Sequence, residues 1–168
     1  MDSKTKKIVL IASMVLIIIT AIALFYSVNI TKDFEFKTGE YFCKMEIINE
    51  GNTNIYKWDI GIANNNTKNG IIENVSNRES LEKFRGTVCG ITKKRVEVFL
   101  VILYLTFILI VFASVQKDSQ ILKNESYKKI FQLFNTLLII FLIYKISISF
   151  FELNGLYKDI NFYFSLLS

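Results

Sequence analysis

Few side chains in this sequence could carry out chemistry, and their types argue against catalysis. Histidine, the commonest acid–base catalyst and metal ligand, is absent from all 168 residues. The two cysteines, Cys43 and Cys89, therefore have no imidazole that could activate a thiolate or complete a zinc site. The sequence also contains no glycine-rich phosphate loop and no cluster with metal-ligand spacing. We predict that the protein is not an enzyme and uses no cofactor or metal.

Three long apolar runs are the main structural elements that the sequence predicts. They cover residues 8–28, 96–115 and 130–151. Each run has about twenty residues, which as a helix is about 30 Å long and matches the hydrocarbon core of a bilayer. The composition agrees, since 52% of residues are hydrophobic and the mean hydropathy is +0.37. The predicted fold class is membrane α-helical, with three transmembrane helices.

Lysines beside the runs predict the orientation of the chain. Short lysine-rich flanks stay cytoplasmic, so residues 1–7 and 116–129 are predicted inside, whereas 29–95 and 152–168 are extracytoplasmic. Lys93, Lys94 and Arg95 argue for the opposite orientation, but they end a long loop, and long loops translocate largely regardless of charge. The lysines on which the prediction depends are Lys4, Lys6, Lys7, Lys117, Lys123, Lys128 and Lys129.

The apolar runs and the charges beside them also predict the location of the protein and its partners. The first run reads as an uncleaved signal anchor; a signal peptide cleaved after Ala21-Ile22-Ala23 is the alternative. We expect a multi-pass protein of the plasma membrane or a secretory-pathway membrane. The net charge of +5 comes from cations at the ends of apolar runs, which anchor helices at headgroups. We therefore expect the lipid bilayer as a partner, and no nucleic acid.

The third run carries one polar stripe, which we call the polar seam. Its members share helical spacing, and polar groups within a span normally face other helices. Lys145 either extends its amine to the headgroups or forms an ion pair, for which Glu97 at the outer end of the second run is the candidate partner. The seam consists of Gln132, Asn135, Lys145, Ser149 and Glu152.

The loop 29–95 is predicted to form a small β module. Tyr41–Ile48 and Ile55–Ile62 are rich in aromatic and β-branched residues, and turn residues separate them at Asn49–Asn54, which predicts a hairpin. Tyr41, Tyr56 and Trp58 form either a local core or a face that binds a partner. Further expected elements are strands at Phe34–Lys37 and Ile71–Val75, a turn at Asn64–Gly70 and a short helix at Arg78–Arg85.

Cys43 and Cys89 both lie in this loop. Two thiols on the oxidising side of a membrane most often form one disulfide, and this one would contribute roughly 4 kcal/mol on the chain-entropy model. We predict a Cys43–Cys89 disulfide that closes the module; two free thiols are the alternative if the loop faces a reducing compartment. Three sequons make Asn65, Asn74 and Asn29 glycosylation candidates, with Asn29 close to the membrane.

The residues after the third run form a short apolar segment. Asn154-Gly155 is typical of a helix end, and Leu156–Ser168 is too short to span a bilayer. We predict that residues 152–168 lie in the outer interface as an amphipathic segment; insertion into a neighbouring subunit is the alternative.

In organisation the chain resembles the claudin and peripheral-myelin tetraspan group, which has a first span, an outer β-rich loop with one disulfide, and then packed spans. Two features depart from that group. Trp58 follows Cys43 instead of preceding both cysteines, and a fourth span is missing. The resemblance implies an architecture alone, so no functional residue is carried over from it.

Small size, a marginal hairpin, a polar seam and an apolar segment all favour a protein that works with neighbours. We predict a non-enzymatic accessory or structural subunit of a larger membrane complex, which contacts other membrane protein subunits through the seam, the outer loop and the apolar segment. Two alternatives stay open. One is a channel or transporter component that assembles from several copies, and the other is an adhesion or receptor-like protein that acts through the outer loop.

Overall fold

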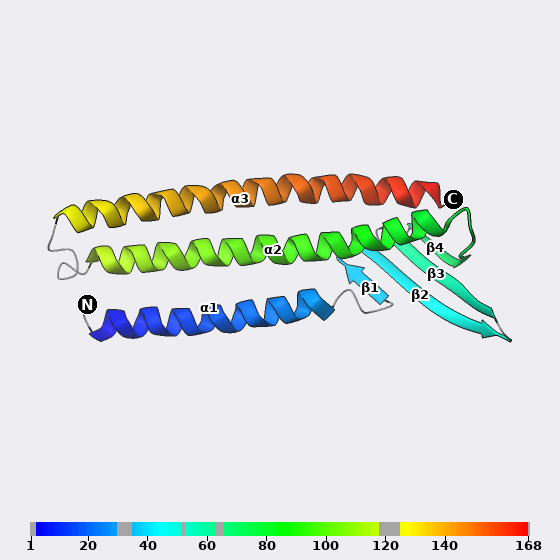
Figure 1. Cartoon of the computed structure of the whole chain (residues 1–168), viewed down its shortest axis with the longest axis horizontal. Helices are drawn as coiled ribbons and strands as arrows, with labels where there is room; N and C mark the ends of the chain where they lie inside the picture. Colours follow the sequence, from blue (N-terminus) through cyan, green and yellow to red (C-terminus); the bar gives the residue numbers. More distant parts are fainter. Residues whose placement is uncertain (1–2, 30–34, 52, 63–65, 118–124, 168) are drawn as a thin grey trace. The chain divides into compact units, whose positions relative to one another are not determined.

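The computed structural model describes residues 3–29, 35–51, 53–62, 66–117 and 125–167. Two compact units make up the chain: a helical unit, Met1–Phe25 with Val96–Phe150, and a sheet unit, Tyr26–Arg95 with Phe151–Ser168. Figure 1 shows the elements in chain order: α1 (Ser3–Asn29), β1 (Glu35–Thr38), β2 (Tyr41–Glu50), β3 (Thr53–Ile62), β4 (Asn66–Ile72), α2 (Arg78–Lys117) and α3 (Glu125–Leu166).

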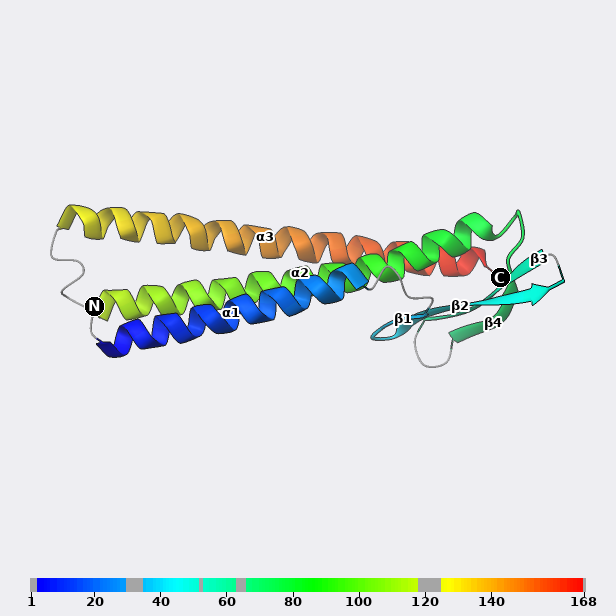
Figure 2. The same ribbon diagram turned by 60° about the horizontal axis from the view of Figure 1, so that its bottom comes forward.

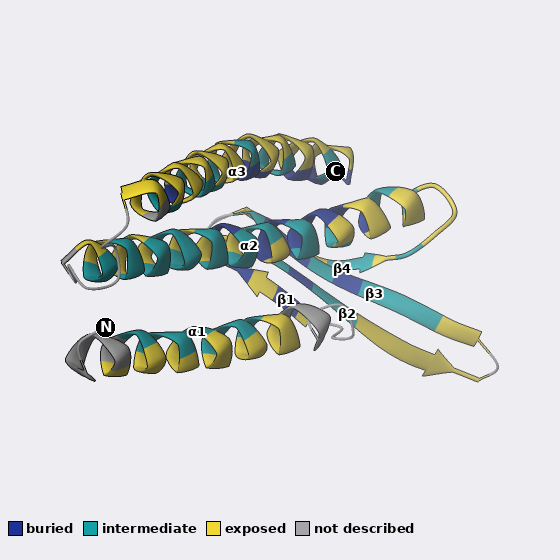
Figure 3. Cartoon of the chain, turned by 60° about the vertical axis from the view of Figure 1, so that its left-hand side comes forward, coloured by how far each residue is buried: buried dark blue, intermediate teal, exposed yellow. Residues whose placement is uncertain are grey.

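The three predicted apolar helices are confirmed. Each contains an 18-residue window apolar enough to cross a membrane, with mean hydropathies of 2.8, 2.9 and 2.0 in α1, α2 and α3. Their side chains in the helical unit are mostly exposed or half-buried, as the colours in Figure 3 show. Helices of this kind bury little apolar surface against one another, which is the pattern expected where lipid rather than water surrounds them.

Helix α2 begins at Arg78, well before the predicted span at Val96. The expected short helix Arg78–Arg85 is its first part, and the chain contains no proline that would end it. Glycines inside a helix cost about 1 kcal/mol each. Here that cost is offset by a buried apolar stripe at spacings of three and four residues, made of Leu81, Phe84, Val88 and Ile91.

Helix α3 does not end at Asn154-Gly155 as predicted, but runs on to Leu166. Its stripe of buried side chains continues past the glycine through Ile160, Phe164 and Leu167. Burying one large aliphatic or aromatic side chain contributes about 1.5–3 kcal/mol, more than a helical glycine costs. The apolar segment predicted to lie in the membrane interface is therefore helical, and it buries these side chains in the core of the sheet unit.

The strands form one antiparallel sheet in the order β1-β2-β3-β4. The predicted hairpin is confirmed as β2 and β3, in which Cys43 pairs with Ile60 and Met45 with Trp58. Gly51 has φ +62°, as the tight hairpin connection between Glu50 and Thr53 requires.

The outer strands match the sequence less closely. Strand β1 covers most of the expected Phe34–Lys37, of which Phe34 lies outside the described residues. The expected turn at Asn64–Gly70 is wrong over its described part, because Asn66–Ile72 is a strand. Its polar side chains suggested a turn, but pairing with β3, for example of Thr67 with Gly61, satisfies its backbone groups.

One face of the sheet is covered by the first turns of α2 and the last turns of α3 (Figure 2). Lys68 on β4 completes this packing: its amine donates to the carbonyl oxygen of Phe164 at 2.8 Å, near the end of α3. A cation there suits the negative end of the helix dipole. The core that results consists of Phe36, Cys43, Trp58 and Ile60 from the sheet, the α2 stripe, Leu153, Ile160 and Phe164 from α3, and Leu167 directly after it.

We expect Ile160→Ala to destabilise the sheet unit by about 2–5 kcal/mol, because it leaves a cavity under the sheet. The control Ile72→Ala makes the same change at a side chain that is 60% exposed, and should cost less than about 1 kcal/mol. Trp58 is the only tryptophan and lies in this core, so its fluorescence during denaturant unfolding reports the sheet unit. Equal midpoints for both variants would show that α3 does not pack there.

Candidate functional site

The most concentrated polar chemistry of the helical unit lies between α2 and α3. The amine of Lys145 lies 3.4 Å from a carboxylate oxygen of Glu97, and the hydroxyl of Ser149 lies 3.4 Å from the same oxygen. The side chains of Lys145 and Glu97 are 46% and 35% exposed, whereas Ser149 is fully buried. This geometry suits the alignment of two antiparallel helices, since a charged pair of this kind fixes register more often than it performs a reaction.

Two of the other three seam residues, Asn135 and Glu152, have partners within the chain. Asn135 is 7% exposed, and its amide donates to the Phe131 carbonyl oxygen, one turn back, at 2.8 Å. Gln132 is half-buried. Glu152 belongs to the sheet unit, where its carboxylate pairs with the Lys94 amine at 2.5 Å. The structure thus brings Lys145 and Ser149 together with Glu97, but it does not join all five seam residues into one site.

Lys93, Lys94 and Arg95 precede the second apolar run, and two of them bind side chains of the sheet unit. Lys94 pairs with Glu152. Arg95 donates to the Tyr157 hydroxyl at 2.8 and 3.0 Å and lies 3.4 Å from the Thr38 hydroxyl. Sequence reasoning missed the Arg95–Tyr157 contact because it assigned Tyr157 to a separate interfacial segment. Lys93, by contrast, is exposed.

The three aromatic residues offered as a partner-binding face belong largely to the core. Trp58 is 1% exposed, so it is not available to a partner. Tyr41 stacks on Tyr157, with ring centroids 5.7 Å apart, and Tyr56 is half-buried against the same core. The local-core interpretation therefore describes this group, and the partner-face interpretation is wrong for Trp58.

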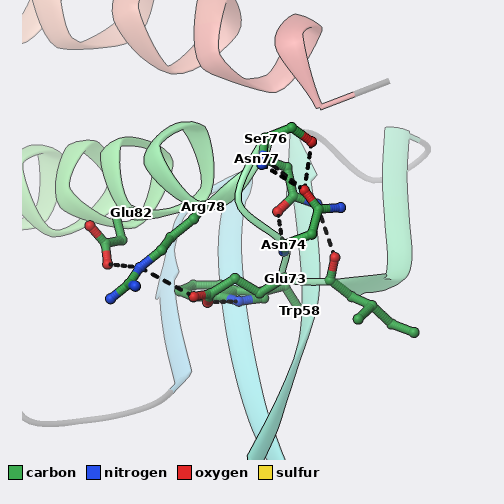
Figure 4. A network of polar contacts seen from close by, with 8 residues as sticks. Trp58, Glu73, Asn74, Ser76, Asn77, Arg78 and Glu82 are labelled. Carbon is green, nitrogen blue, oxygen red and sulfur yellow. Dashed lines mark hydrogen bonds and ion pairs between the residues drawn. The ribbon is translucent and has the colours of Figure 1, made fainter.

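A polar network links Trp58 to the start of α2, as Figure 4 shows. The indole N–H donates to Glu73 at 2.9 Å, and the other Glu73 oxygen lies 3.4 Å from Arg78, which also pairs with Glu82 at 3.3 Å. The indole gains the partner that a buried N–H requires. This network anchors the helix start to the sheet, and sequence reasoning did not identify it.

Two of the three sequon asparagines, Asn74 and Asn29, lie within the described residues. Asn74 is exposed just before α2, and its side-chain oxygen accepts from the Ser76 and Asn77 backbone N–H groups at 2.9 and 3.1 Å. That oxygen organises the turn shown in Figure 4. Asn29 is the last residue of α1. Asn65 lies outside the described residues.

The predicted Cys43–Cys89 disulfide is wrong, because both thiols are free. Cys43 points into the core beneath the sheet and is fully buried. On α2, Val88 is fully buried in this core, and Cys89, one position further on, is half-buried and packs against the same core. The two thiols therefore differ in how far they are buried. Burial raises the pKa of the Cys43 thiol to about 12, partly opposed by the charge of Arg85.

An apolar groove lies between α1 and α2 in the helical unit. Its volume is about 300 Å³. The two hydroxyls of Thr20 and Tyr104, 3.1 Å apart, provide a polar contact between the same helices. The groove is lined by Ala12, Val15, Leu16 and Ile19 from α1, and by Phe99, Ile102, Leu103, Thr106, Phe107 and Ile110 from α2.

A second groove, which we call the glycine groove, lies along α2 in the sheet unit. It has a volume of about 450 Å³ and is lined by Glu82, Arg85, Gly86, Cys89, Gly90 and Lys93. A Cβ at Gly90 would meet Leu156 at 3.4 Å, which is an ordinary van der Waals contact. At Gly86 nothing lies within 4 Å of where a Cβ would stand, although glycine inside a helix costs about 1 kcal/mol.

Among the described residues, no group of three or more Cys, Asp or Glu side chains is placed to hold a metal ion. No protein-family model, curated protein or solved structure matches this chain.

We expect the two thiols to differ in reactivity toward a maleimide. At pH 7 Cys89, half-buried in an open groove, should be modified first, and Cys43 only once the sheet unit unfolds. Mass spectrometry of the labelled Cys43→Ser and Cys89→Ser variants measures the rate at each thiol separately. Equal labelling rates at pH 7 would contradict the buried position of Cys43.

The stability of the sheet unit should also depend on the protonation of Cys43. Because the pKa of the Cys43 thiol is raised in the folded state, its contribution to stability is fully present below pH 9 and is lost as pH rises toward about 12.

We expect the Glu97–Lys145 pair to show energetic coupling. Both side chains are more than one third exposed, so the coupling energy should be small, about 0.5–1 kcal/mol. A double-mutant cycle with Glu97→Gln and Lys145→Met, measured by unfolding in mild detergent, gives this value directly. Additive effects of the two changes would show that the charges do not interact.

Proposed function

We propose that this chain is an integral membrane protein that serves as a non-enzymatic accessory subunit of a larger membrane complex. The observation that carries the proposal is the uncovered apolar surface of the helices. In the apolar windows, none of the α1 residues and only 11% of the α2 and α3 residues are buried within the chain. Contiguous apolar surface of this extent is stable in lipid or against other helices, not in water.

The α1–α2 groove is the proposed contact site for a partner helix. It is apolar, and it includes the small residue Ala12, next to which a neighbouring helix can approach closely. The polar seam is a weaker candidate for this role than the sequence indicated. Ser149 and Asn135 are buried within the chain, and Lys145 is paired with Glu97.

The sheet unit is proposed to lie on the extracytoplasmic side, with residues 1–7 in the cytoplasm, in a plasma or secretory-pathway membrane. The lysine-rich flanks of the apolar helices support this orientation. Lys93, Lys94 and Arg95, which precede the apolar part of α2, favour the opposite orientation. Their weight in this argument is reduced, because Lys94 and Arg95 have structural partners in the sheet unit. A folded module outside the membrane is a second surface through which an accessory subunit could contact its complex.

The test is the native mass of the chain extracted from its own membrane in mild detergent, with identification of the proteins that co-purify in fixed ratio. Ala12→Trp fills the α1–α2 groove and should reduce co-purification of a partner by about tenfold or more, a loss of at least 1.4 kcal/mol. Ala21→Trp makes the same change at an exposed site on α1 outside the groove, and should leave the complex intact.

Three outcomes would contradict the proposal. A monomer without companions would exclude a stable subunit role. A closed assembly of this chain alone would favour the self-assembling channel or transporter component instead. Partner loss with both tryptophan variants would show that α1 contributes generally, and that the groove has no special role.

A further inference from the structure

We propose that Asn74 is modified by an N-linked oligosaccharide. This inference rests on the proposed function, because it takes the sheet unit as extracytoplasmic, which is the side of the membrane where such sugars are attached. It adds a modification site in the sheet unit that the accessory-subunit role does not require.

The first argument is the exposure of the acceptor tripeptide. Asn74, Val75 and Ser76 match the sequon Asn-X-Ser/Thr, in which the middle residue is not proline. All three residues are exposed, and Val75 is 100% exposed. They lie in the turn before α2 that Figure 4 shows. A bulky, hydrophilic sugar chain therefore has room at this position.

The second argument is the hydrogen bonding of the Asn74 side chain. Its oxygen Oδ1 accepts from the Ser76 hydroxyl at 2.6 Å, and from the backbone N–H groups of Ser76 and Asn77 at 2.9 and 3.1 Å. Among the described residues, no hydrogen bond involves its nitrogen Nδ2, the atom to which an N-linked sugar is attached. A glycosylated asparagine keeps its carbonyl oxygen, so the same three bonds can hold the turn before and after modification.

The third argument is the distance of Asn74 from the apolar part of α2. Residues 78–95 of α2 belong to the sheet unit, and at the rise of an α-helix they are about 26 Å long. This length of helix separates Asn74 from Val96, where the predicted span begins. Asn29, by contrast, directly follows the apolar run 8–28, at the level of the lipid headgroups. Asn74 is therefore the more accessible acceptor of the two.

The modification requires a sugar donor from the membrane, namely an oligosaccharide joined to a polyprenyl lipid through pyrophosphate, and a transferase on the extracytoplasmic side. In the transfer, the bond between the anomeric carbon and the pyrophosphate oxygen breaks, and its electron pair leaves with the lipid pyrophosphate. The Asn74 nitrogen forms a bond to the anomeric carbon and loses one proton to solvent. The step needs no oxidant or reductant.

The test measures the mass of the peptide that contains Asn74, from the full-length chain purified from its own membrane. We expect this peptide to carry an added mass that fragments into sugar residues. Asn74→Asp keeps the oxygen that accepts the three hydrogen bonds but lacks the nitrogen, so this variant should lose the added mass completely and still fold. Ser76→Thr keeps the sequon and should keep the sugar. Trp58 fluorescence confirms the fold of both variants.

A further sequon provides an internal control. Asn124 begins the tripeptide Asn-Glu-Ser in the loop predicted to be cytoplasmic, and it lies outside the described residues. Its peptide should carry no sugar, because the donor and the transferase act on the opposite side of the membrane.

Two results would overturn the inference: an unmodified Asn74 peptide, and an added mass that persists in Asn74→Asp. The orientation is measured separately, by labelling Cys89 with a membrane-impermeant maleimide in sealed vesicles of known sidedness. If Cys89 is labelled from the extracytoplasmic side and Asn74 is unmodified, the inference alone fails. If Cys89 is labelled only from the cytoplasmic side and Asn124 carries the sugar, the proposed orientation fails as well.

Discussion

Burial of the sheet's apolar face under two helix segments is the interaction on which the sheet unit depends. A hairpin alone is marginal in water, and even four strands need a covered face. The cover comes from Phe84 and its neighbours on α2 and from Ile160 and Phe164 on α3. These two helices also carry windows apolar enough to cross a membrane, so the cover of the sheet and the candidate spans belong to the same two elements.

The charged side chains of the sheet unit are distributed differently on the covered and the uncovered face of the sheet. Along β2, alternate residues turn away from the core, and there Lys44 lies opposite Asp59 and Glu46 opposite Lys57. Opposite charges in cross-strand positions favour the observed register. On the covered side the charged groups sit at the margins, where Lys94 and Arg95 bind residues of α3. Among the described residues, most of the large apolar side chains that are exposed belong to the helical unit.

The sequence predicted the elements well where one periodicity dominated. Length and hydropathy were sufficient for three helices, and alternation around Trp58 was sufficient for the hairpin. It failed where a local signal competed with distant packing. Gly155 is a typical helix end, yet α3 continues, because Ile160 and Phe164 find a core made by residues far away in the chain. The disulfide prediction failed for a related reason. The number of cysteines and the expected compartment suggested a bridge, but whether two thiols come within bonding distance depends on how α2 packs on the sheet, and both thiols are free.

The contact between Lys68 and the end of α3 has a consequence for the order in which the protein is made. Strand β4 is synthesised before both long helices, but its lysine binds the carbonyl oxygen of Phe164. The four strands and the covering residues of α2 thus emerge long before residues 153–167, and the apolar parts of α2 and α3 are made in the meantime. During that interval the face around Trp58 lacks the cover that α3 provides. A newly made sheet of this kind exposes apolar residues that are buried in the finished protein, and the arrival of residues 153–167 ends that exposure.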